Sequence, residues 1–369
     1  MSVRKRILPS GEIRWLVDYR DGGGKRRFKQ FATQKEATAF RDATGVAVRA
    51  GMHIADAASV TVAKAGELWL DRCRLDGLEA GTLRNYKQHL DLHILPLIGG
   101  VKLSKLTKPG IVAFRNKLLE THSKVMAAKA MVSLKSLLSN AQERGLVAQN
   151  VATGVKVKVN SRDKKRIEIP EKDEIRAMVA KVNEWPINEP WRPFMLTALF
   201  TGLRPSELRG LVWDCVDFDK KLIRVHQRAD FRGTMGHPKS EAGNRDVPLA
   251  PMVLNALRQW RLACPKTEAG LVFPAKHGGV IGHTEVWRMW NQLLEAIGLP
   301  RKHHRLYDLR HVAASLFIEQ GMQPKKIKTI MGHSSIRITF DLYGHLWETP
   351  EKDAKAMEEI ETRLLHTVK

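Results

Sequence analysis

The chain of 369 residues is too long for one ordinary hydrophobic core, so two or three domains are expected. Its 62 Lys and Arg residues against 39 Asp and Glu give a formal net charge of +23 and a pI near 10.1, which indicates a polyanionic partner, with nucleic acid as the first candidate. The sequence has no apolar run of about 18 residues, no secretory start and no closely spaced pair among Cys73, Cys215 and Cys264, which argues against a membrane protein and a disulfide framework and favours a cytoplasmic location.

Residues 1–55 predict a small three-stranded β-sheet followed by a helix. Apolar residues alternate with polar ones between positions 13 and 19, a DGGG turn follows, and the chain returns as KRRFKQF. Thr33 and Glu36 then form a capping box, which predicts a helix that runs to about Arg49. Twelve Lys or Arg residues against five acidic ones give this short segment a net charge of +7, which favours a DNA-contacting sheet over a merely solvated one.

Residues 58–155 predict a helical domain. Helix starts are indicated at Thr61, Thr82, Thr107 and Ser123, each followed by an amphipathic run. The last of these helices carries a Met and Leu stripe and is expected to stop at Gly145. The stripe consists of Met126, Met131, Leu134, Leu137 and Leu138. Such a stripe predicts a core face rather than a cofactor site.

Residues 156–167 predict a basic linker, in which only Asp163 opposes the Lys and Arg residues. Such a run could be a solvated tether or could lie along a DNA backbone. From residue 168 to residue 369 the pattern is helical again, interrupted by the strand-like LIRVHQRADF and GNRDVPL around a Gly-rich hairpin. We therefore expect a mainly α fold with small antiparallel β-sheets, made of a β-sheet-plus-helix domain, a helical domain and a mixed α+β domain.

Two motifs of the last domain place cations where they could bind phosphate. In LFTGLRPSELRGLVW, Arg204 lies at a turn ahead of a helix, and Glu207 follows three residues later. The carboxylate could accept hydrogen bonds from one side of the guanidinium, while its other N–H groups remain able to bind a phosphate. Lys239 lies in HPKSEAGNRDVPL, within the predicted hairpin. Taken alone, an Arg-Glu pair at a helix start is usually structural, and a loop lysine is usually a solvated charge.

Two further motifs complete the set. Arg310 lies near the start of a predicted helix in LYDLRHVAAS, and a helix break in MGHSSIRITFDLYGHL presents His333 ahead of Tyr343. The ordered set TGLRPSEL, PKS, DLRH, GHSS and TFDLYGH resembles the tyrosine recombinases, the phage integrase family, from about residue 168 to the end. The similarity extends more loosely to the helical segment before it, which would then be a SAM-like core-binding domain. The N-terminal sheet and helix resemble the arm-binding domain of phage and genomic-island integrases.

The resemblance implies a role for each residue of the catalytic motifs. Tyr343 matches the nucleophile, which attacks a DNA phosphorus to form a 3′-phosphotyrosyl link and free a 5′-hydroxyl, with no metal, ATP or other cofactor. Arg204 and Arg310 match the pair that binds the non-bridging oxygens, where negative charge grows in the transition state.

Three other residues complete the implied site. Lys239 matches the acid that protonates the departing 5′-oxygen. His333 matches a histidine that hydrogen-bonds the phosphate, and Glu207 matches an acidic residue that supports the site. The family also implies double-stranded DNA with core and arm sites, a homotetramer that passes through a Holliday junction, and integration and excision of a prophage or mobile element in the nucleoid. An excisionase and a host DNA-bending protein are the expected accessory partners.

Tyr307 is the departure from the family pattern, because most members have histidine three residues before the second arginine. His304 and His311 lie nearby but lack that spacing, so the role is not transferred to them. A phenol with a reference pKa of about 10 accepts a proton poorly at neutral pH but remains a good donor. We therefore expect Tyr307 to donate a hydrogen bond to the phosphate. Failure to replace the lost donor would cost roughly 3 kcal/mol, about a hundredfold in rate.

Several alternatives stay open from the sequence. A type IB topoisomerase uses similar chemistry but rejoins the same strand, and a chromosome-dimer resolvase typically lacks an N-terminal arm domain. A catalytically decayed DNA-binding regulator would keep the basic charge without the strand transfer. A metal nuclease is less favoured, because the motif regions show no cluster of acidic residues or histidines at metal-ligand spacing.

Overall fold

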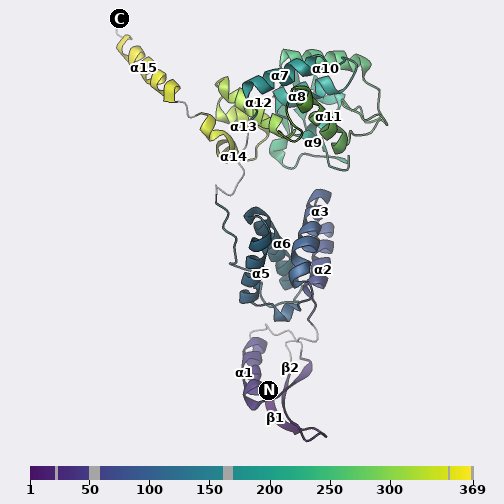
Figure 1. The fold of residues 1–369 in the computed structure, drawn as a ribbon, viewed down its shortest axis with the longest axis vertical. Coiled ribbons are helices and arrows are strands. Elements are labelled where there is room, and N and C mark those ends of the chain that lie inside the picture. Colours follow the sequence, from purple (N-terminus) through teal and green to yellow (C-terminus); the bar gives the residue numbers. More distant parts are fainter. Residues whose placement is uncertain (21–23, 50–58, 161–168, 348–349, 367–369) are drawn as a thin grey trace. The chain divides into compact units, whose positions relative to one another are not determined.

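The computed structural model describes residues 1–20, 24–49, 59–160, 169–347 and 350–366. The chain separates into two compact units, Met1–Lys165 and Arg166–Lys369, which are described one at a time (Figure 1). The predicted linker falls largely on residues 161–168, outside the described residues, and the domain boundaries proposed above stay predictions. Within the described ranges, none of the helices combines the length and the apolar character needed to cross a bilayer.

The N-terminal segment is a three-stranded antiparallel sheet with one helix, as its alternating pattern predicted. The elements are β1 Ser2–Ile7, β2 Ile13–Arg20, β3 Arg26–Phe31 and α1 Gln34–Arg49, and the strand order is β1-β2-β3. Val17 and Tyr19 from β2 and Ala37 from α1 are buried together in a small core. The capping box is present, since the backbone N of Glu36 donates to Thr33 Oγ1 (3.2 Å) and that of Thr33 to Glu36 Oε2 (3.3 Å).

The second part of the first unit is helical. Its elements are α2 Val62–Leu75, α3 Ala80–His89, a π-helical turn Leu90–Ile94, α4 Leu95–Ile98, a 3₁₀ turn Leu103–Lys105, α5 Lys108–Thr121 and α6 Lys124–Glu143. The hydroxyls of Thr61, Thr107 and Ser123 each accept a backbone N–H at a helix start, so those three predictions are confirmed. The predicted start at Thr82 is wrong. The helix begins at Ala80, because the carbonyl of Glu79 already accepts from the backbone N of Thr82 (2.8 Å), and no side-chain oxygen marks that cap.

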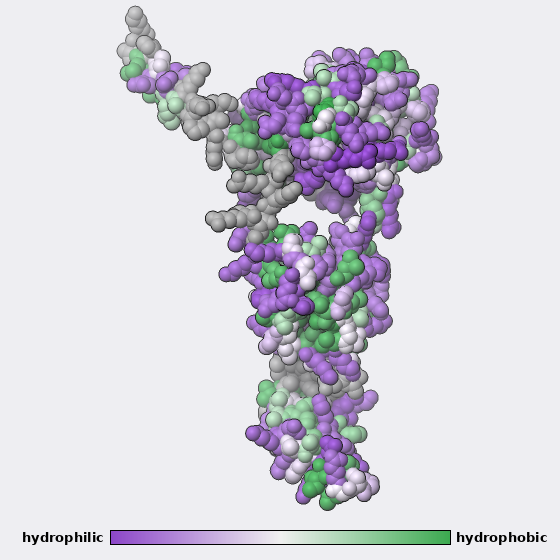
Figure 2. All heavy atoms as spheres, in the orientation of Figure 1, coloured by the Kyte–Doolittle hydropathy of each residue, from purple (hydrophilic) through white to green (hydrophobic). Residues whose placement is uncertain are grey.

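The second unit is a helical assembly with two small sheets. Its helices are α7 Lys172–Asn183, α8 Trp191–Thr201, α9 Pro205–Arg209, α10 Pro251–Ala263, α11 His283–Ala296, α12 Asp308–Glu319, α13 Pro324–Met331, α14 Ile336–Tyr343 and α15 Pro350–His366. The strands are β4 Val216–Asp217, β5 Leu222–Val225, β6 Arg228–Ala229, β7 Met235–Gly236 and β8 Arg245–Pro248, in the antiparallel sheets β4-β5-β8 and β6-β7. The mainly α fold with small antiparallel sheets is therefore confirmed. The visible face of this unit is mostly hydrophilic (Figure 2).

Helix α8 runs through the middle of the second unit and is buried along nearly all of its length. It packs against α10 and α12, and it ends at Gly202, whose φ is +64°. A Cβ on Gly202 would lie 2.8 Å from the Sδ atom of Met331 and 3.2 Å from the Cβ of Ala313. Glycine thus allows the turn that carries Arg204 to lie directly against α12 and α13.

Candidate active site

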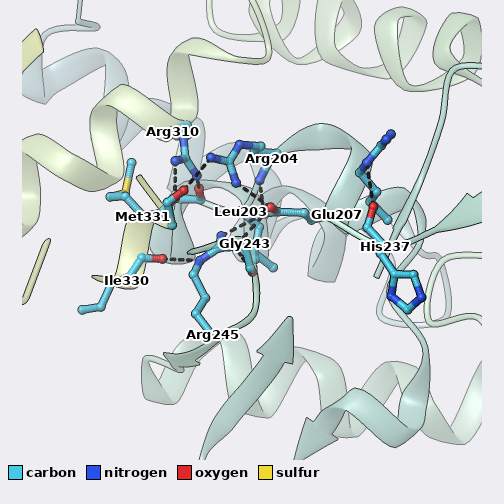
Figure 3. A network of polar contacts seen from close by, with 12 residues as sticks. Leu203, Arg204, Glu207, His237, Gly243, Arg245, Arg310, Ile330 and Met331 are labelled. Atoms are coloured by element: carbon cyan, nitrogen blue, oxygen red, sulfur yellow. Dashed lines mark hydrogen bonds and ion pairs between the residues drawn. The ribbon is translucent and has the colours of Figure 1, made fainter. Parts of the chain in front are cut away.

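Arg204 and Glu207 are joined at the first turn of α9. The Glu207 carboxylate accepts from the Arg204 backbone N (2.8 Å) through Oε2 and from Arg204 Nη1 (2.7 Å) through Oε1. Arg204 Nη2 donates to the carbonyl of Gly332 (2.8 Å), at the corner between α13 and α14 (Figure 3). The Arg204 side chain keeps 30% of its surface exposed, whereas that of Glu207 keeps 2%. The guanidinium is therefore held by Glu207 and Gly332 on one side and is accessible to solvent on the other.

Arg245 on β8 is a member of this network that the sequence reasoning missed. Its Nη1 and Nη2 donate to the two carboxylate oxygens of Glu207 (3.1 and 2.8 Å), and its Nε donates to the carbonyl of Ile330 (2.6 Å). Burial alone would raise the pKa of Glu207, but the hydrogen bonds and charge of Arg245 and the charge of Arg204 outweigh it and lower that pKa. The available signal was strand alternation, which turns Arg245 and Val247 inward and Asp246 outward.

Arg310 lies in the first turn of α12 with only 2% of its surface exposed. Its Nη1 donates to the carbonyl of Gly202 (2.5 Å) and its Nη2 to the carbonyl of Met331. Burial and the neighbouring charge of Arg204 lower the pKa of Arg310 to about 10, so the guanidinium is still protonated at neutral pH. Arg204 and Arg310 thus both reach the Met331–Gly332 corner (Figure 3).

His333 follows that corner and is buried. Its Nδ1 lies 2.9 Å from the hydroxyl of Thr339. Burial and the charges of Arg310, Arg204 and Arg245 lower the pKa of His333 to about 3, so the imidazole is neutral at physiological pH. When Nδ1 accepts from the Thr339 hydroxyl, the proton sits on Nε2, which can then act as a hydrogen-bond donor.

Tyr343, the last residue of α14, is fully buried among apolar side chains that include Ile327 and Met331. Its hydroxyl lies 2.7 Å from Nδ1 of His311, a contact that the sequence reasoning did not assign. Burial raises the pKa of Tyr343, and burial lowers the pKa of His311. Both groups are therefore neutral, and the phenol donates to the imidazole. The sequence does not indicate this contact, because His311 follows Arg310 directly and does not precede it by three residues.

Two expected site residues lie at the surface. Tyr307 is 43% exposed at the start of α12, and its ring lies edge-on to that of His311 at 5.5 Å. Lys239 is exposed on the loop between β7 and β8. The same loop reaches the buried network through the carbonyl of Gly243, which accepts from Arg245 Nη1 (2.9 Å). The loop that carries Lys239 is therefore joined to the arginine cluster at Gly243.

Comparison with known proteins places this arrangement in a family. The phage integrase family matches residues 169–349, and the phage integrase N-terminal SAM-like domain matches residues 61–119. A tyrosine recombinase XerC-like protein of Caldanaerobacter subterraneus subsp. tengcongensis is 26% identical, over 92% of this chain and 93% of that protein. The ICEBs1 integrase of Bacillus subtilis is 25% identical, over 78% of this chain and 79% of that protein.

Solved structures share the fold. The Tn1549 transposon integrase in complex with a circular intermediate DNA has a TM-score of 0.68 at 19% identity, covering 82% of this chain and 100% of that one. A lambda integrase dimer bound to a core site has a TM-score of 0.60 at 17% identity, covering 93% of this chain and 94% of that one. The resemblance inferred from the ordered motifs is confirmed, and the chain belongs to the phage integrase family of tyrosine recombinases.

Proposed function

We propose that the chain is a site-specific DNA recombinase of the integrase type, which integrates and excises a prophage or another mobile element. The observation that carries this proposal is the meeting of two arginines and a neutral histidine at the Met331–Gly332 corner, with the ring of the buried Tyr343 stacked on that of His333 at 6.4 Å. The similarity to the ICEBs1 integrase and to the Tn1549 transposon integrase supports the same assignment. The reaction would proceed by transesterification, through a 3′-phosphotyrosyl intermediate and a Holliday junction.

Arg204 and Arg310 would bind the scissile phosphate. Their guanidiniums are close enough that the charge of Arg204 contributes to the lowered pKa of Arg310. A phosphodiester adds negative charge to this cluster, and more negative charge develops on its non-bridging oxygens as phosphorus becomes five-coordinate. Because Glu207 and backbone carbonyls already orient both side chains, little reorganisation is needed when the phosphate binds. His333 would add a neutral N–H donor.

Tyr343 would supply the nucleophile and His311 would accept its proton. As the phenolic oxygen bonds to phosphorus, its proton passes to Nδ1 of His311, and the bond from phosphorus to the 5′-oxygen breaks. Lys239 would give a proton to that leaving oxygen. In the second step a 5′-hydroxyl attacks the phosphotyrosyl ester, Lys239 takes the proton back, and His311 returns one to Tyr343. No external oxidant, reductant or energy source is required.

Full burial of Tyr343 places one condition on this reaction. A side chain with 0% exposure cannot reach the phosphorus of a duplex until α14 or the side chain itself moves. Helix α14 carries Ile338 and Phe340 on its exposed face and buries Thr339 and Tyr343 on the other. We infer that DNA binding shifts this short helix and so couples cleavage to assembly on the site.

Tyr307 would act as an auxiliary hydrogen-bond donor to the phosphate. It is exposed, lies one turn ahead of Arg310 and contacts the ring of His311. In that position it can also shield the His311–Tyr343 contact from water. Its contribution should not exceed that of a single oxyanion donor, roughly 3 kcal/mol.

We propose double-stranded DNA as the substrate, with core sites bound by the helical and catalytic domains and arm sites bound by residues 1–55. Lambda integrase, which has a similar fold, forms a dimer on a core site and a tetramer on a Holliday junction, and a homotetramer is proposed here by analogy. An excisionase and a host DNA-bending protein would set the direction of recombination. The reaction would take place at the nucleoid.

A nicked suicide substrate built from the junction between element and host DNA tests the proposal. Cleavage releases the short end, so the protein stays linked to the DNA as a covalent band on a denaturing gel. The wild type should form the band and yield recombinant joints, and Tyr343→Phe should form neither. Relaxation of supercoiled DNA without joints would indicate a topoisomerase, and binding without a covalent band would indicate a regulator. A covalent band from Tyr343→Phe would overturn the assignment of the nucleophile.

A further inference from the structure

A second cluster of polar side chains lies outside the strand-transfer site. It joins the first turn of α7 to the connection between α11 and α12. Glu174 Oε2 lies 3.0 Å from His304 Nε2, and Glu174 Oε1 lies 3.6 Å from His303 Nε2. One donor atom from each residue falls within 4.8 Å of the other two, and the two imidazole rings are 4.5 Å apart at 72°. The catalytic proposal does not use this cluster.

The spacing fits a tetrahedral transition-metal ion. Zinc bonds to imidazole nitrogen and carboxylate oxygen at about 2.0–2.1 Å, which puts neighbouring donors of a tetrahedron roughly 3.3 Å apart. Glu174 Oε2 lies 3.0 Å from His304 Nε2 and Oε1 lies 3.6 Å from His303 Nε2, so each imidazole lies near that spacing from one oxygen of the carboxylate. Two imidazoles and one carboxylate suit Zn²⁺, Ni²⁺ or Cu²⁺ and do not suit Mg²⁺ or Ca²⁺, which prefer oxygen ligands.

Glu174 and His304 are already held in place by other contacts. Trp290 Nε1 donates to the carbonyl of His304 (2.8 Å), and Glu174 Oε2 accepts from the backbone N of Glu171 (2.8 Å) in the capping box of α7. The turn before them is also fixed, because Lys302 has a φ of +64° and its backbone N donates to Asn291 Oδ1 (3.0 Å). Ligands fixed in this way lose little freedom when an ion binds.

His304 is the buried histidine of the cluster. The residue is only 6% exposed, and its Nδ1 has no hydrogen-bond partner among the described residues. Burial of a polar imidazole is unfavourable unless its nitrogens are satisfied, and here Nε2 alone meets a polar group, Glu174. The ion would bind Nε2, the nitrogen that faces the carboxylate, and this bond would offset part of the cost of burying the imidazole.

We propose that Glu174, His303 and His304 bind one divalent transition-metal ion such as Zn²⁺, which connects α7 to the turn ahead of α12. Three protein ligands would leave the fourth position of the tetrahedron to water, and the ion would connect the two elements without taking part in strand transfer. His304 precedes Tyr307 by three residues and Arg310 by six, so the ion would steady the start of the helix that carries both. The sequence alone does not reveal the cluster, since Glu174 and His304 are 130 positions apart.

Metal uptake by the full chain, without tag and without DNA, tests the proposal independently of recombination. The protein is stripped with a chelator, dialysed against Zn²⁺ and analysed for bound metal. We expect one zinc per wild-type chain and a loss of that zinc in His303→Ala and Glu174→Gln. His303 is partly exposed, and glutamine keeps an oxygen for the helix cap, so both variants should fold. His277→Ala removes another exposed histidine and should keep the zinc.

Two further readouts separate a metal site from an ordinary Glu-His contact. Co²⁺ in place of Zn²⁺ should give the visible absorption of tetrahedral cobalt in the wild type and not in His303→Ala, whereas Mg²⁺ should not compete. Zinc should raise the melting temperature of the wild type more than that of Glu174→Gln. No stoichiometric zinc in the wild type, or equal zinc in the wild type and both variants, would overturn the proposal, the second result by placing the ion elsewhere.

Discussion

The hydroxyl of Tyr343 lies 2.7 Å from Nδ1 of His311, and both side chains are buried. The proposed nucleophile is therefore held against a neutral base before any DNA binds. The histidine that most family members carry three residues before the second arginine is replaced by Tyr307, while His311 contacts the reacting oxygen directly. We therefore propose that His311, one residue beyond Arg310, accepts the proton of Tyr343.

His311→Ala should slow cleavage by about 10²–10⁴-fold, because the phenolic proton loses its acceptor. Single-turnover cleavage of the nicked substrate measures this rate, and DNA binding should be unchanged. Added imidazole should restore part of the rate, which a purely structural defect would not allow. Burial lowers the pKa of His311 below its ordinary value of 6.5, so the acid limb of the wild-type pH profile should lie below pH 6.5. An alanine variant that cleaves at the wild-type rate would exclude His311 as the base.

Tyr307→Phe should still cleave, with a rate lowered by no more than about a hundredfold. The hydroxyl supplies one hydrogen bond at the edge of the site, whereas the ring contact with His311 is kept in phenylalanine. The same cleavage assay, run beside Tyr343→Phe, measures the difference. Tyr307→His restores the pattern of most family members and should cleave at least as fast as the wild type. Complete loss of cleavage in Tyr307→Phe would give Tyr307 an essential role.

Arg245→Met should destabilise the second unit by about 3–5 kcal/mol, because it leaves the Glu207 carboxylate buried without its main partner. Urea unfolding followed by circular dichroism measures the change. Adding Glu207→Gln to this variant should recover part of the stability, since the uncompensated charge is then gone. Arg224→Ala is the matched control, because the Arg224 side chain of its pair with Asp217 is 46% exposed and the pair should contribute at most about 1 kcal/mol.

Gly202→Ala should destabilise the protein and also weaken cleavage. Alanine at a φ of +64° is strained, and its Cβ would press on Met331 at 2.8 Å, at the corner where both arginines bind. Gly145→Ala has a similar φ of +68° with no atom within 4 Å of the added Cβ. Thermal unfolding should show about 1 kcal/mol of backbone strain in Gly145→Ala and a larger loss in Gly202→Ala. Equal losses would show that the Met331 contact is unimportant.

Wild-type stability should fall between about pH 6.5 and pH 3 in part through His333. Its pKa is lowered from 6.5 to about 3 in the folded chain, so below pH 6.5 the unfolded chain binds a proton that the folded chain does not. Stability is therefore fully present above pH 6.5 and is lost as the pH falls through the folded-state pKa. His333→Asn should lose less stability over this window, as measured by melting temperature against pH. An identical pH dependence in both proteins would contradict the shift.

Sequence patterns within a few residues predicted the local structure well. The hydroxyls of Thr61, Thr107 and Ser123 cap the helices that they were expected to start, because a cap depends only on a residue and the backbone N–H three positions later. The start of α3 was misplaced, since Glu79 caps it without a side-chain hydrogen bond. The four motifs sufficed to identify the family, because their residue types and order are specific.

By itself, then, the sequence determined the mainly α fold, the family, and the residues Arg204, Arg310 and Tyr343 as candidates for the chemistry. Only the tertiary structure decided that Arg245 holds Glu207, that His311 faces Tyr343, and that Glu174 meets His304, 130 positions away, and its neighbour His303. These contacts join elements that are distant in the chain, so their geometry follows from the packing of whole helices around α8. A linear pattern can show which side chains carry charge or a proton, but the fold decides which of them share a buried space and how that burial shifts each pKa.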